Sequence, residues 1–570
     1  MVAAIYYHPD GYETSREHLM GRHAAGEGML KAICQYATDD RLYCYTADEN
    51  HFKHFLKKVQ SFSQGKRICT WIHPSRMSQL KEPGALFMPG PVLSDLAWLR
   101  RHRETRDYSL CGVTHTTATD RAMDSIANLV SAPLQPWDAL VCTSQSVKQM
   151  VQNLMHNYQD YLTDRFGAQK AISLPIALPI IPLGADFTIF DQPEVKRSEY
   201  RKQWREKLRI GADDAAVLYV GRFSFHDKAH PVPMYLALEQ CHKSVGKPIT
   251  LIMAGWFQND VLKQEFITAA QVFCPNIKVI FVDGRNTAVK KTIWFAADVF
   301  TSLSDNVQET FGLTPIEAMA AGLPVVVSDW DGYKETVRDG VDGYRIPTWT
   351  APSGIGVGLA LGYASGSESY GNYVGYQSQF TSVDVQKCTE AFSRLLNDVA
   401  LRKQMGENGK LRARALFDWK VVIKQWETLW AHQKETRTTA QEIGKRRTSQ
   451  PANPLRDDPF SLFAHYPTNL LAPNSLIEKT FRASPDFVRA IGNLKITNFG
   501  SKLAYDPARI MRLLDSIPNG ETVTVQSLCS RVPGSEGQAL LFSILWLSKL
   551  GLINLSADNQ VIANNVRASR

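Results

Sequence analysis

The stretch SDNVQETFGLTPIEAMAAGLPVVVSD, residues 304–329, decides the fold of this chain. Its end, VVVSD, is a short apolar run of the kind that forms a buried strand. Thr314, Pro315 and Glu317 form T-P-x-E, a capping box with proline at the first helical position. We therefore expect a helix that begins at Pro315, ends at Gly322 and leads directly into the strand.

The start of this helix is a predicted binding site for phosphate. A helix begins with free N–H groups and the positive end of its dipole, and both attract anions. The small residues in EAMAA let the helix lie close to a sheet, in the geometry at which α/β folds hold ligands. Glu309 precedes the helix, so its carboxylate can reach a ligand bound there. The alternatives are that the two glutamates share this spacing by chance and that Glu317 only caps the helix.

Short apolar runs rich in Val, Ile and Leu recur along the chain, and helical patterns follow them. Such runs, alternating with helices, indicate parallel sheets that are covered on both faces. The runs are 2–7, 109–115, 138–144, 216–222, 249–255, 277–284, 298–304 and 323–329. They fall into two sets that meet at residues 180–187. We therefore expect an α/β fold with two doubly wound, Rossmann-like domains facing a cleft.

Changes in composition mark the expected domain boundaries. The first domain covers residues 1–185 and the second covers residues 186–434. Within the second domain, residues 351–382 are rich in Gly, Ser and Tyr and are expected to form an inserted loop. A polar, basic and proline-bearing linker follows at 435–460, and a small, mainly helical domain occupies 461–570.

This last domain resembles a winged-helix module, because three helical segments are followed by a turn. From residue 503 to the end it carries six basic and five acidic residues, a balance of +1. A DNA-binding surface would show clustered basic residues. We therefore expect the module to dock a protein partner or to be purely structural, and not to bind DNA.

The composition is that of a soluble globular protein, with 44% hydrophobic and 21% charged residues and a formal charge of +8. The nine cysteines are scattered, without CxxC pairs or zinc spacing, which favours a reduced, cytoplasmic setting. The amino terminus is typical of a first strand and not of a signal peptide. Residues 93–106 combine Leu and Trp with four arginines. Peripheral contact with an anionic membrane is one interpretation, and a sheet-covering helix with a solvated basic face is the other.

Around the two glutamates the sequence resembles a known family. The pattern E-x-FG-L-x3-EAMAAGLPVVVSD is similar to the nucleotide-site signature of the retaining glycosyltransferases of family 4, which have the GT-B fold and an E-x7-E motif. The resemblance implies that Glu309 contacts the donor sugar and is catalytic, whereas Glu317 holds the ribose of the nucleotide. It also implies that the turn before the helix binds the donor phosphate through its backbone. The residues of that turn are Phe311, Gly312, Leu313 and Thr314.

Other segments match the family in order. VGRFSFHDK resembles a G-R-x-K element, so Arg222 and Lys228 would neutralise the donor diphosphate and stabilise the leaving group. The alternative is an arginine and a lysine on a surface loop. FVDG lies where family members read the base, which makes Gly284 a candidate for donor binding.

The first domain contributes three further candidates. Gly26 and Gly28 lie in GRHAAGEGML, after the first strand, where glycines could let the backbone approach the donor. His115 in GVTHTT is placed at the carboxyl end of a strand, and family members have a catalytic histidine there. The alternative for His115 is a hydrogen-bonded core histidine.

The function implied is transfer of a hexosyl group from a nucleotide sugar to an acceptor hydroxyl, with retention of configuration and without a metal or other cofactor. The acceptor is left open among a polysaccharide or other glycan, a lipid-linked molecule and a small molecule. One alternative is a protein that senses sugar nucleotides and recruits partners through its C-terminal module. Another is a glycoside hydrolase that uses Glu309 and Glu317 as its acid and nucleophile.

Overall fold

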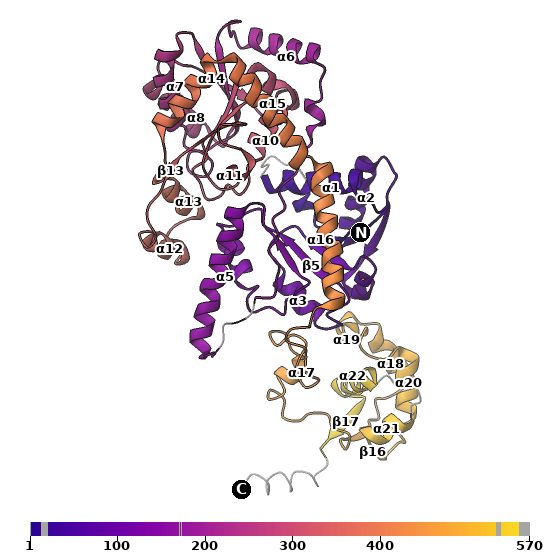
Figure 1. Ribbon diagram of the computed structural model, residues 1–570. Helices are drawn as coiled ribbons and strands as arrows, with labels where there is room; N and C mark the ends of the chain where they lie inside the picture. Colours follow the sequence, from indigo (N-terminus) through magenta and orange to yellow (C-terminus); the bar gives the residue numbers. More distant parts are fainter. Residues whose placement is uncertain (1, 13–20, 170–171, 173, 532–536, 558–570) are drawn as a thin grey trace. The chain divides into compact units, whose positions relative to one another are not determined.

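The structure, a computed structural model, describes residues 2–12, 21–169, 172, 174–531 and 537–557 of the 570-residue chain. The chain divides into two compact units, Met1–Asn453 and Pro454–Arg570. The larger unit contains two six-stranded sheets, and each belongs to one domain (Figure 1).

The sheet of the first domain is entirely parallel, with strand order β3-β2-β1-β4-β5-β6. Its strands are β1 (Ala4–Tyr6), β2 (Arg41–Tyr45), β3 (Ile68–Ile72), β4 (Ala85–Met88), β5 (Ser109–Val113) and β6 (Ala139–Val141). The helices of this domain are η1 (Pro9–Gly11), α1 (Gly21–Tyr36), α2 (Glu49–Ser63), η2 (Pro74–Lys81), α3 (Ser94–Arg100), α4 (Asp120–Ala127) and α5 (Gln145–Phe166). Separate apolar clusters cover the two faces, one including residues of α1 and α2 and the other residues of α3, α4 and α5.

The sheet of the second domain repeats this topology, with strand order β12-β11-β10-β7-β8-β9 and parallel pairing throughout. Its strands are β7 (Ala215–Phe223), β8 (Ile249–Phe257), β9 (Lys278–Asp283), β10 (Val299–Ser302), β11 (Val325–Ser328) and β12 (Gly343–Ile346). Its helices are η3 (Phe187–Phe190), α6 (Glu194–Lys207), α7 (Val232–Val245), α8 (Asp260–Phe273), α9 (Thr287–Thr292), η4 (Ile293–Ala296), α10 (Leu313–Ala320), α11 (Tyr333–Thr336), α14 (Val385–Asn397) and α15 (Val399–Leu416). The order is that of a doubly wound nucleotide-binding fold in both domains, so the predicted fold class is confirmed.

Each of the eight predicted apolar runs overlaps a strand of one of these sheets. Four strands were not predicted, namely β2, β3, β4 and β12. β3 is the edge strand of its sheet and is largely half-buried, so its sequence lacks the continuous apolar run of a central strand.

The predicted loop at 351–382 is wrong as a loop, because it contains α12 (Val357–Ala364) and α13 (Tyr370–Gln379). The antiparallel strands β13 (Thr348–Trp349) and β14 (Ser382–Val383) close its base. Ser369 caps α13 by accepting a hydrogen bond from the N–H of Asn372, and Val374 and Ser378 are buried. The helix therefore depends on tertiary burial, which the Gly- and Ser-rich composition conceals.

The end of the second domain and the linker also differ from expectation. α16 (Trp419–Thr439) returns to the first domain, where Trp426 and Trp430 join its core (Figure 1). Beyond α16, Ile443 exchanges hydrogen bonds with the side chain of Gln135. Residues 435–453 therefore belong to the larger unit, and the linker predicted at 435–460 is wrong over this part.

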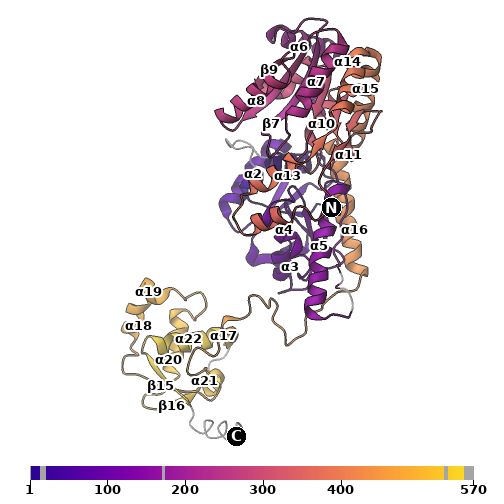
Figure 2. The same ribbon diagram turned by 90° about the vertical axis from the view of Figure 1, so that its left-hand side faces the viewer.

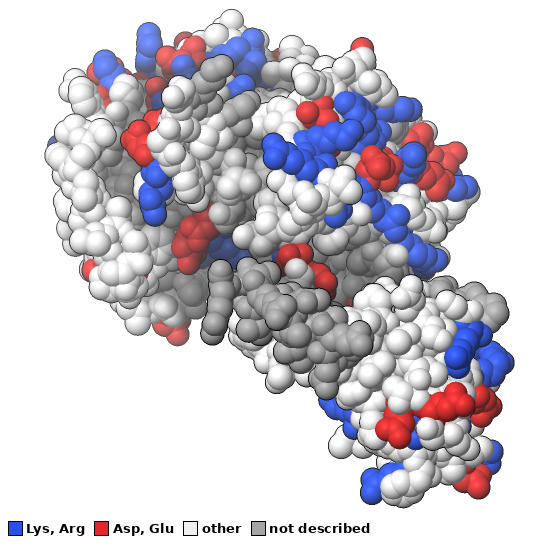
Figure 3. All heavy atoms as spheres, turned by 90° about the horizontal axis from the view of Figure 1, so that it is seen from below, with Lys and Arg blue, Asp and Glu red and all other residues white. Residues whose placement is uncertain are grey.

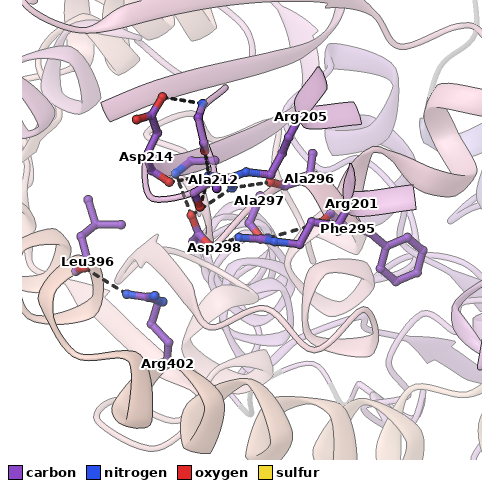
Figure 4. A network of polar contacts seen from close by, with 12 residues as sticks. Arg201, Arg205, Ala212, Asp214, Phe295, Ala296, Ala297, Asp298, Leu396 and Arg402 are labelled. Atoms are coloured by element: carbon purple, nitrogen blue, oxygen red, sulfur yellow. Dashed lines mark hydrogen bonds and ion pairs between the residues drawn. The ribbon is translucent and has the colours of Figure 1, made fainter. Parts of the chain in front are cut away.

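A polar network fixes the amino-terminal edge of the second sheet (Figure 4). Asp298, which precedes β10, accepts a hydrogen bond from Arg201 of α6 at 2.7 Å and one from the N–H of Ala216 in β7 at 2.8 Å. Arg205 of α6 donates to the carbonyl oxygen of Ala296 at 3.2 Å. Because β7 and β10 are joined at their amino-terminal ends and pair along the sheet, the distance between their carboxyl-terminal ends is also fixed.

The smaller unit has its own core around Ile477, Leu513 and Leu540. Its antiparallel sheet has the order β16-β15-β17, formed by β15 (Leu476–Lys479), β16 (Thr522–Thr524) and β17 (Ile553–Ser556). Its helices are α17 (Pro459–Leu462), α18 (Pro485–Gly492), α19 (Lys495–Asn498), α20 (Pro507–Asp515), α21 (Val525–Arg531) and α22 (Gly537–Lys549). The three predicted helices are confirmed as α20, α21 and α22, whereas the winged-helix assignment stays a prediction. On the face seen in Figure 3, basic and acidic side chains are interspersed over the described residues.

Of the four arginines in segment 93–106, Arg100 is not part of a solvated basic face, whereas Arg103 and Arg106 are exposed. Arg100 is fully buried and makes two hydrogen bonds to Asp138, at 2.7 and 2.6 Å. Arg106 lies over the ring of Trp137 and donates to the carbonyl oxygens of Arg437 and Ala440. Over the described ranges, no helix combines the length and the apolar character needed to cross a bilayer.

The buried ion pair yields a stability prediction. Arg100→Ala leaves the carboxylate of Asp138 buried and without its charged partner, so we expect the free energy of unfolding to fall by about 3–5 kcal/mol. Arg103→Ala, on an exposed residue of the same segment, is the control and should change the free energy of unfolding by less than about 0.5 kcal/mol. Denaturant unfolding of both variants measures the difference. Equal midpoints would show that the pair contributes nothing.

Candidate functional site

The candidate site lies where the winding of the second sheet reverses. β7 and β10 are neighbours there, and the loops that follow them, 224–231 and 303–312, leave the same edge of the sheet. In doubly wound folds this is the place where ligands bind. Arg222 is near the end of β7 and Lys228 lies in the first loop, whereas Glu309 lies in the second loop.

Two polar residues join these loops. The carboxylate of Asp305 accepts from the N–H of His230, at 3.3 and 3.4 Å, and the side-chain amide of Asn306 donates to the carbonyl oxygen of His226 at 2.8 Å. Both residues are buried, and burial raises the pKa of Asp305 to about 7. The sequence analysis missed this pair, although a polar Asp-Asn directly after a buried strand could have indicated it.

Arg222 is already partnered by a carboxylate. Its guanidinium donates to Asp227 at 2.7 Å, and the two side chains are 24% and 15% exposed. The pair orients Arg222 and leaves most of its five donors for other acceptors. Lys228 is half-buried, and its carbonyl oxygen accepts a hydrogen bond from Ser304 at 3.3 Å.

The charges of Glu309 and Arg222 both influence the pKa of the Tyr219 hydroxyl. Burial raises the pKa of Tyr219 and of Tyr333, and the negative charge of Glu309 raises both further. The positive charge of Arg222 acts on the pKa of Tyr219 in the opposite direction. Arg222, in β7, and Glu309, in the loop after β10, therefore both lie near Tyr219 at one end of the sheet.

The helix after Glu309 begins earlier than predicted. α10 starts at Leu313, so Thr314 lies inside its first turn and the expected capping box is wrong. Gly312 occupies the cap position with φ of +85°, and no side chain caps the helix. The left-handed backbone at Gly312 is what lets the chain enter the helix before Pro315. The first N–H groups of α10 therefore have no side-chain acceptor from the cap.

The side chains of the turn serve packing. Phe311 is 2% exposed and packs edge-on against Phe417, so only its backbone is available to a ligand. A Cβ at Gly312 would lie 1.9 Å from the ring of Tyr333.

Gly284, which follows β9, also packs closely. It donates its N–H to the carbonyl oxygen of Gly255 at 2.8 Å, and a Cβ at Gly284 would lie 2.9 Å from the Cα of Gly255. Donor binding by Gly284 and by the residues of the turn stays a prediction.

Glu317 faces a lysine that the sequence analysis missed. Burial raises the pKa of Glu317 to about 7, and the nearby ammonium of Lys290 lowers it in part. Lys290 belongs to α9, and its sequence neighbourhood carries no motif that would have indicated it.

His115 lies beside the loop of Glu309 through a contact of its backbone. The hydroxyl of Thr310 donates to the carbonyl oxygen of His115 at 3.2 Å, and Thr143 donates to the carbonyl oxygen of Thr310 at 3.1 Å. His115 also lines a small, mainly apolar cavity with Gly26 and the hinge residue Leu183. The two domains thus meet directly next to Glu309.

Gly26 and Gly28 lie within α1, where packing accounts for both. A Cβ at Gly26 would lie 2.0 Å from the carbonyl oxygen of Gly11. A Cβ at Gly28 would lie 3.2 Å from the ring of Trp419 in α16. Close approach of other parts of the chain explains both glycines, and their contact with a donor stays a prediction.

A second contact between the domains involves the start of α5. Ser144, its N-cap, donates to Asp331 at 2.9 Å, and the N–H of Gln145 donates to Glu335. Asp331 has φ of +39°, a left-handed conformation that is rare outside glycine. Burial raises the pKa of Asp331 to about 7. The sequence analysis missed Ser144, although its place before a long helix is typical of a cap.

Comparison with known proteins now adds to this geometry. Residues 200–351 match the family model described as Glycosyl transferases group 1. The matched segment covers all six strands of the second sheet. It contains Arg222, Lys228, Gly284 and both glutamates, whereas His115, Gly26 and Gly28 lie outside it.

Curated relatives are similar over part of their length. The chain is 26% identical over 247 residues to D-inositol 3-phosphate glycosyltransferase of Nocardia farcinica, which covers 42% of this chain and 51% of the relative. It is 28% identical over 200 residues to alpha-monoglucosyldiacylglycerol synthase of Streptococcus pneumoniae, covering 35% and 39%. The chain thus spans about half or less of the length of these relatives. A solved structure of Anabaena Alr3699/HepE in complex with UDP and glucose aligns with 76% of this chain and all of its own, at 13% identity and a TM-score of 0.47.

The buried carboxyl of Asp305 yields a pH prediction. Its pKa is about 7 in the folded chain, against 3.8 for an unperturbed aspartate, so the unfolded chain loses the proton first as pH rises. The free energy of unfolding should therefore fall between pH 4 and 7, by up to about 1.4 kcal/mol per pH unit from this group. Asp305→Asn should flatten this slope, measured by denaturant unfolding at pH 5 and 7. Asp213→Asn, on an exposed residue, is the control, and equal slopes for the two variants would contradict the assignment.

Proposed function

We propose that this protein transfers a hexosyl group from a nucleotide sugar to a hydroxyl of an acceptor, with retention of the anomeric configuration. The observation that carries the proposal is the placement of Arg222 near the end of β7, of Lys228 in the loop after β7 and of Glu309 in the loop after β10. Asp305 and Asn306 join these two loops. The match of residues 200–351 to group 1 glycosyl transferases supports it.

The charges of the site suit the bond that breaks. Cleavage of the bond between the anomeric carbon and the phosphate oxygen leaves positive charge on the sugar and negative charge on the diphosphate. Arg222, Lys228 and the first N–H groups of α10 would stabilise the diphosphate, with Asp227 orienting the guanidinium of Arg222. Glu309 would hold the hydroxyls of the donor sugar, and His115 would face the sugar from the first domain.

The same arrangement suggests how water is excluded and how the acceptor reacts. The domains meet at Thr310, next to Glu309, so a closed cleft would shield the sugar from hydrolysis. In a front-face reaction, the departing phosphate would take the proton of the acceptor hydroxyl while that oxygen bonds to the anomeric carbon. The reaction would need no cofactor, and metal independence is part of the proposal.

The acceptor is proposed only as a hydroxyl compound. The names of the two relatives contain an inositol phosphate and a diacylglycerol, which are different classes of acceptor. A membrane patch on residues 93–106 would lack Arg100, which is buried in the fold.

The proposal predicts separable effects at the two glutamates. Glu309→Gln should lower kcat by at least about 100-fold while a nucleoside diphosphate still binds, because the carboxylate would act on the sugar. Glu317→Gln should instead weaken nucleotide binding by about 10- to 100-fold, the loss of a charged hydrogen bond to the ribose. Thermal-shift titration with UDP-, GDP- and ADP-sugars identifies the donor, and release of nucleoside diphosphate measures turnover.

Two outcomes would overturn this assignment. Unchanged turnover in Glu309→Gln would remove the glutamate from the reaction. Tight binding of a sugar nucleotide without multiple turnover, over a broad panel of hydroxyl acceptors, would favour a sensing protein that recruits partners. Glu407→Gln, an exposed residue of α15, serves as the control for both measurements.

A further inference from the structure

The helical insertion between β13 and β14 is built into the candidate site. In α13, the hydroxyl of Ser378 donates to the carboxylate of Asp305 at 3.0 Å, and the carbonyl oxygen of Val374 accepts from the side chain of Asn306 at 3.3 Å. Ser378 and Val374 are buried. The insertion thus holds the same two residues that join the loops after β7 and β10.

The insertion also contacts both loops directly. Gln308, the residue before Glu309, donates from its side chain to the hydroxyl of Tyr370 at 2.9 Å. On the other loop, a Cβ at Gly375 would lie 3.0 Å from the Cβ of His226, so α13 lies against this residue. Three of the four residues that precede Glu309 are therefore held by α13, which restricts where its carboxylate can lie.

The insertion reaches the first domain as well. Tyr363, near the end of α12, accepts a hydrogen bond from the N–H of Asp120, the first residue of α4, at 2.8 Å. The ring of Tyr363 stacks on that of Tyr373 in α13, with centroids 4.6 Å apart and planes at 14°. Figure 2 shows the two insertion helices in front of the first domain, next to α4. A continuous set of contacts thus runs from α4, through Tyr363 and α13, to the loop of Glu309.

We propose that Tyr363, Tyr370 and Ser378 are positioning residues, through which the insertion couples contact between the two domains to the placement of Glu309. This proposal rests on the proposed function of the site, because it assigns a consequence for turnover. When the domains separate, the bond from α4 to Tyr363 breaks, and α13 loses the support that its stacked tyrosine gives. The loop of Glu309 then gains freedom, which lowers the fraction of molecules in the reactive arrangement.

The contacts favour coupling over a purely structural role. A structural insertion would need only the buried anchors Val374 and Ser378. Tyr363 contributes a hydrogen bond to the other domain and no buried core contact, and α12 has no buried residue. A change in the distance between the domains would therefore act directly on the hydrogen bond from Asp120 to Tyr363.

The direct test is hydrogen exchange of the loop of Glu309, which requires no turnover. Tyr363→Phe removes only the hydroxyl that accepts from Asp120, a residue far from 303–310 in the sequence and in the other domain. We expect amide exchange in peptides covering 303–310 to quicken by about two- to tenfold, the effect of losing one hydrogen bond. Tyr376→Phe, a partly exposed residue of α13, is the matched control and should leave exchange unchanged. Faster exchange confined to α12 and α4 would overturn the proposal.

Kinetics provide the second test. Tyr363→Phe and Tyr370→Phe should each lower kcat by about two- to tenfold with little change in donor affinity. The double variant should lose less than the product of the two single losses, because both act on one set of contacts. Fully independent losses, or unchanged kcat in both variants, would overturn the proposal. If the wild-type protein shows no turnover, the proposed function fails, whereas hydrogen exchange still decides the coupling.

Discussion

The structure depends on the joining of two loops by Asp305 and Asn306. Strands β7 and β10 end at the same edge of the second sheet, but neighbouring strands alone do not hold the loops that follow them. The hydrogen bonds from the N–H of His230 to Asp305, and from Asn306 to the carbonyl oxygen of His226, supply that constraint. At the opposite edge Asp298 joins the same two strands and α6. The charges of the site are thus positioned by polar contacts at both ends of one strand pair, and the sheet between them serves as a rigid spacer.

Burying carboxyl groups to achieve this is costly, and the structure compensates in three ways. Asp305 accepts hydrogen bonds from Ser378 and from the backbone, Glu317 lies near Lys290, and Asp331 accepts from Ser144. None of these is a full salt bridge, so burial still raises the pKa of each carboxyl to about 7. Polar groups that are incompletely compensated in this way are concentrated where function is expected.

Much of the fold was predictable, because long apolar runs report burial on both faces of a parallel sheet. The edge strand β3 and the four-residue β12 were missed since their burial is partial. Within the site, the resemblance to a family pointed to Glu309, Arg222 and His115, but it did not point to Asp305, Lys290 or Ser144, whose roles arise from distant contacts. The start of α10 was missed because the left-handed backbone of Gly312 overrides a local capping pattern. Arg100 was missed for a related reason, since a run of arginines does not reveal which member has a buried aspartate as partner.

The contacts between the domains also combine the cost of a desolvated carboxyl with hydrogen bonds that offset this cost. Asp331 combines a left-handed backbone with a buried carboxyl, and both oppose its contact with the first domain. The hydroxyl of Ser144 and the positive end of the α5 dipole favour that contact. Because both favourable and opposing contributions act at this one contact, we expect closed and open arrangements of the domains to differ by little free energy. The proposed reaction needs this small difference, because the cleft would have to admit a donor, exclude water and release a product. Strain and desolvation lie at the domain boundary, whereas the cores on either side are apolar.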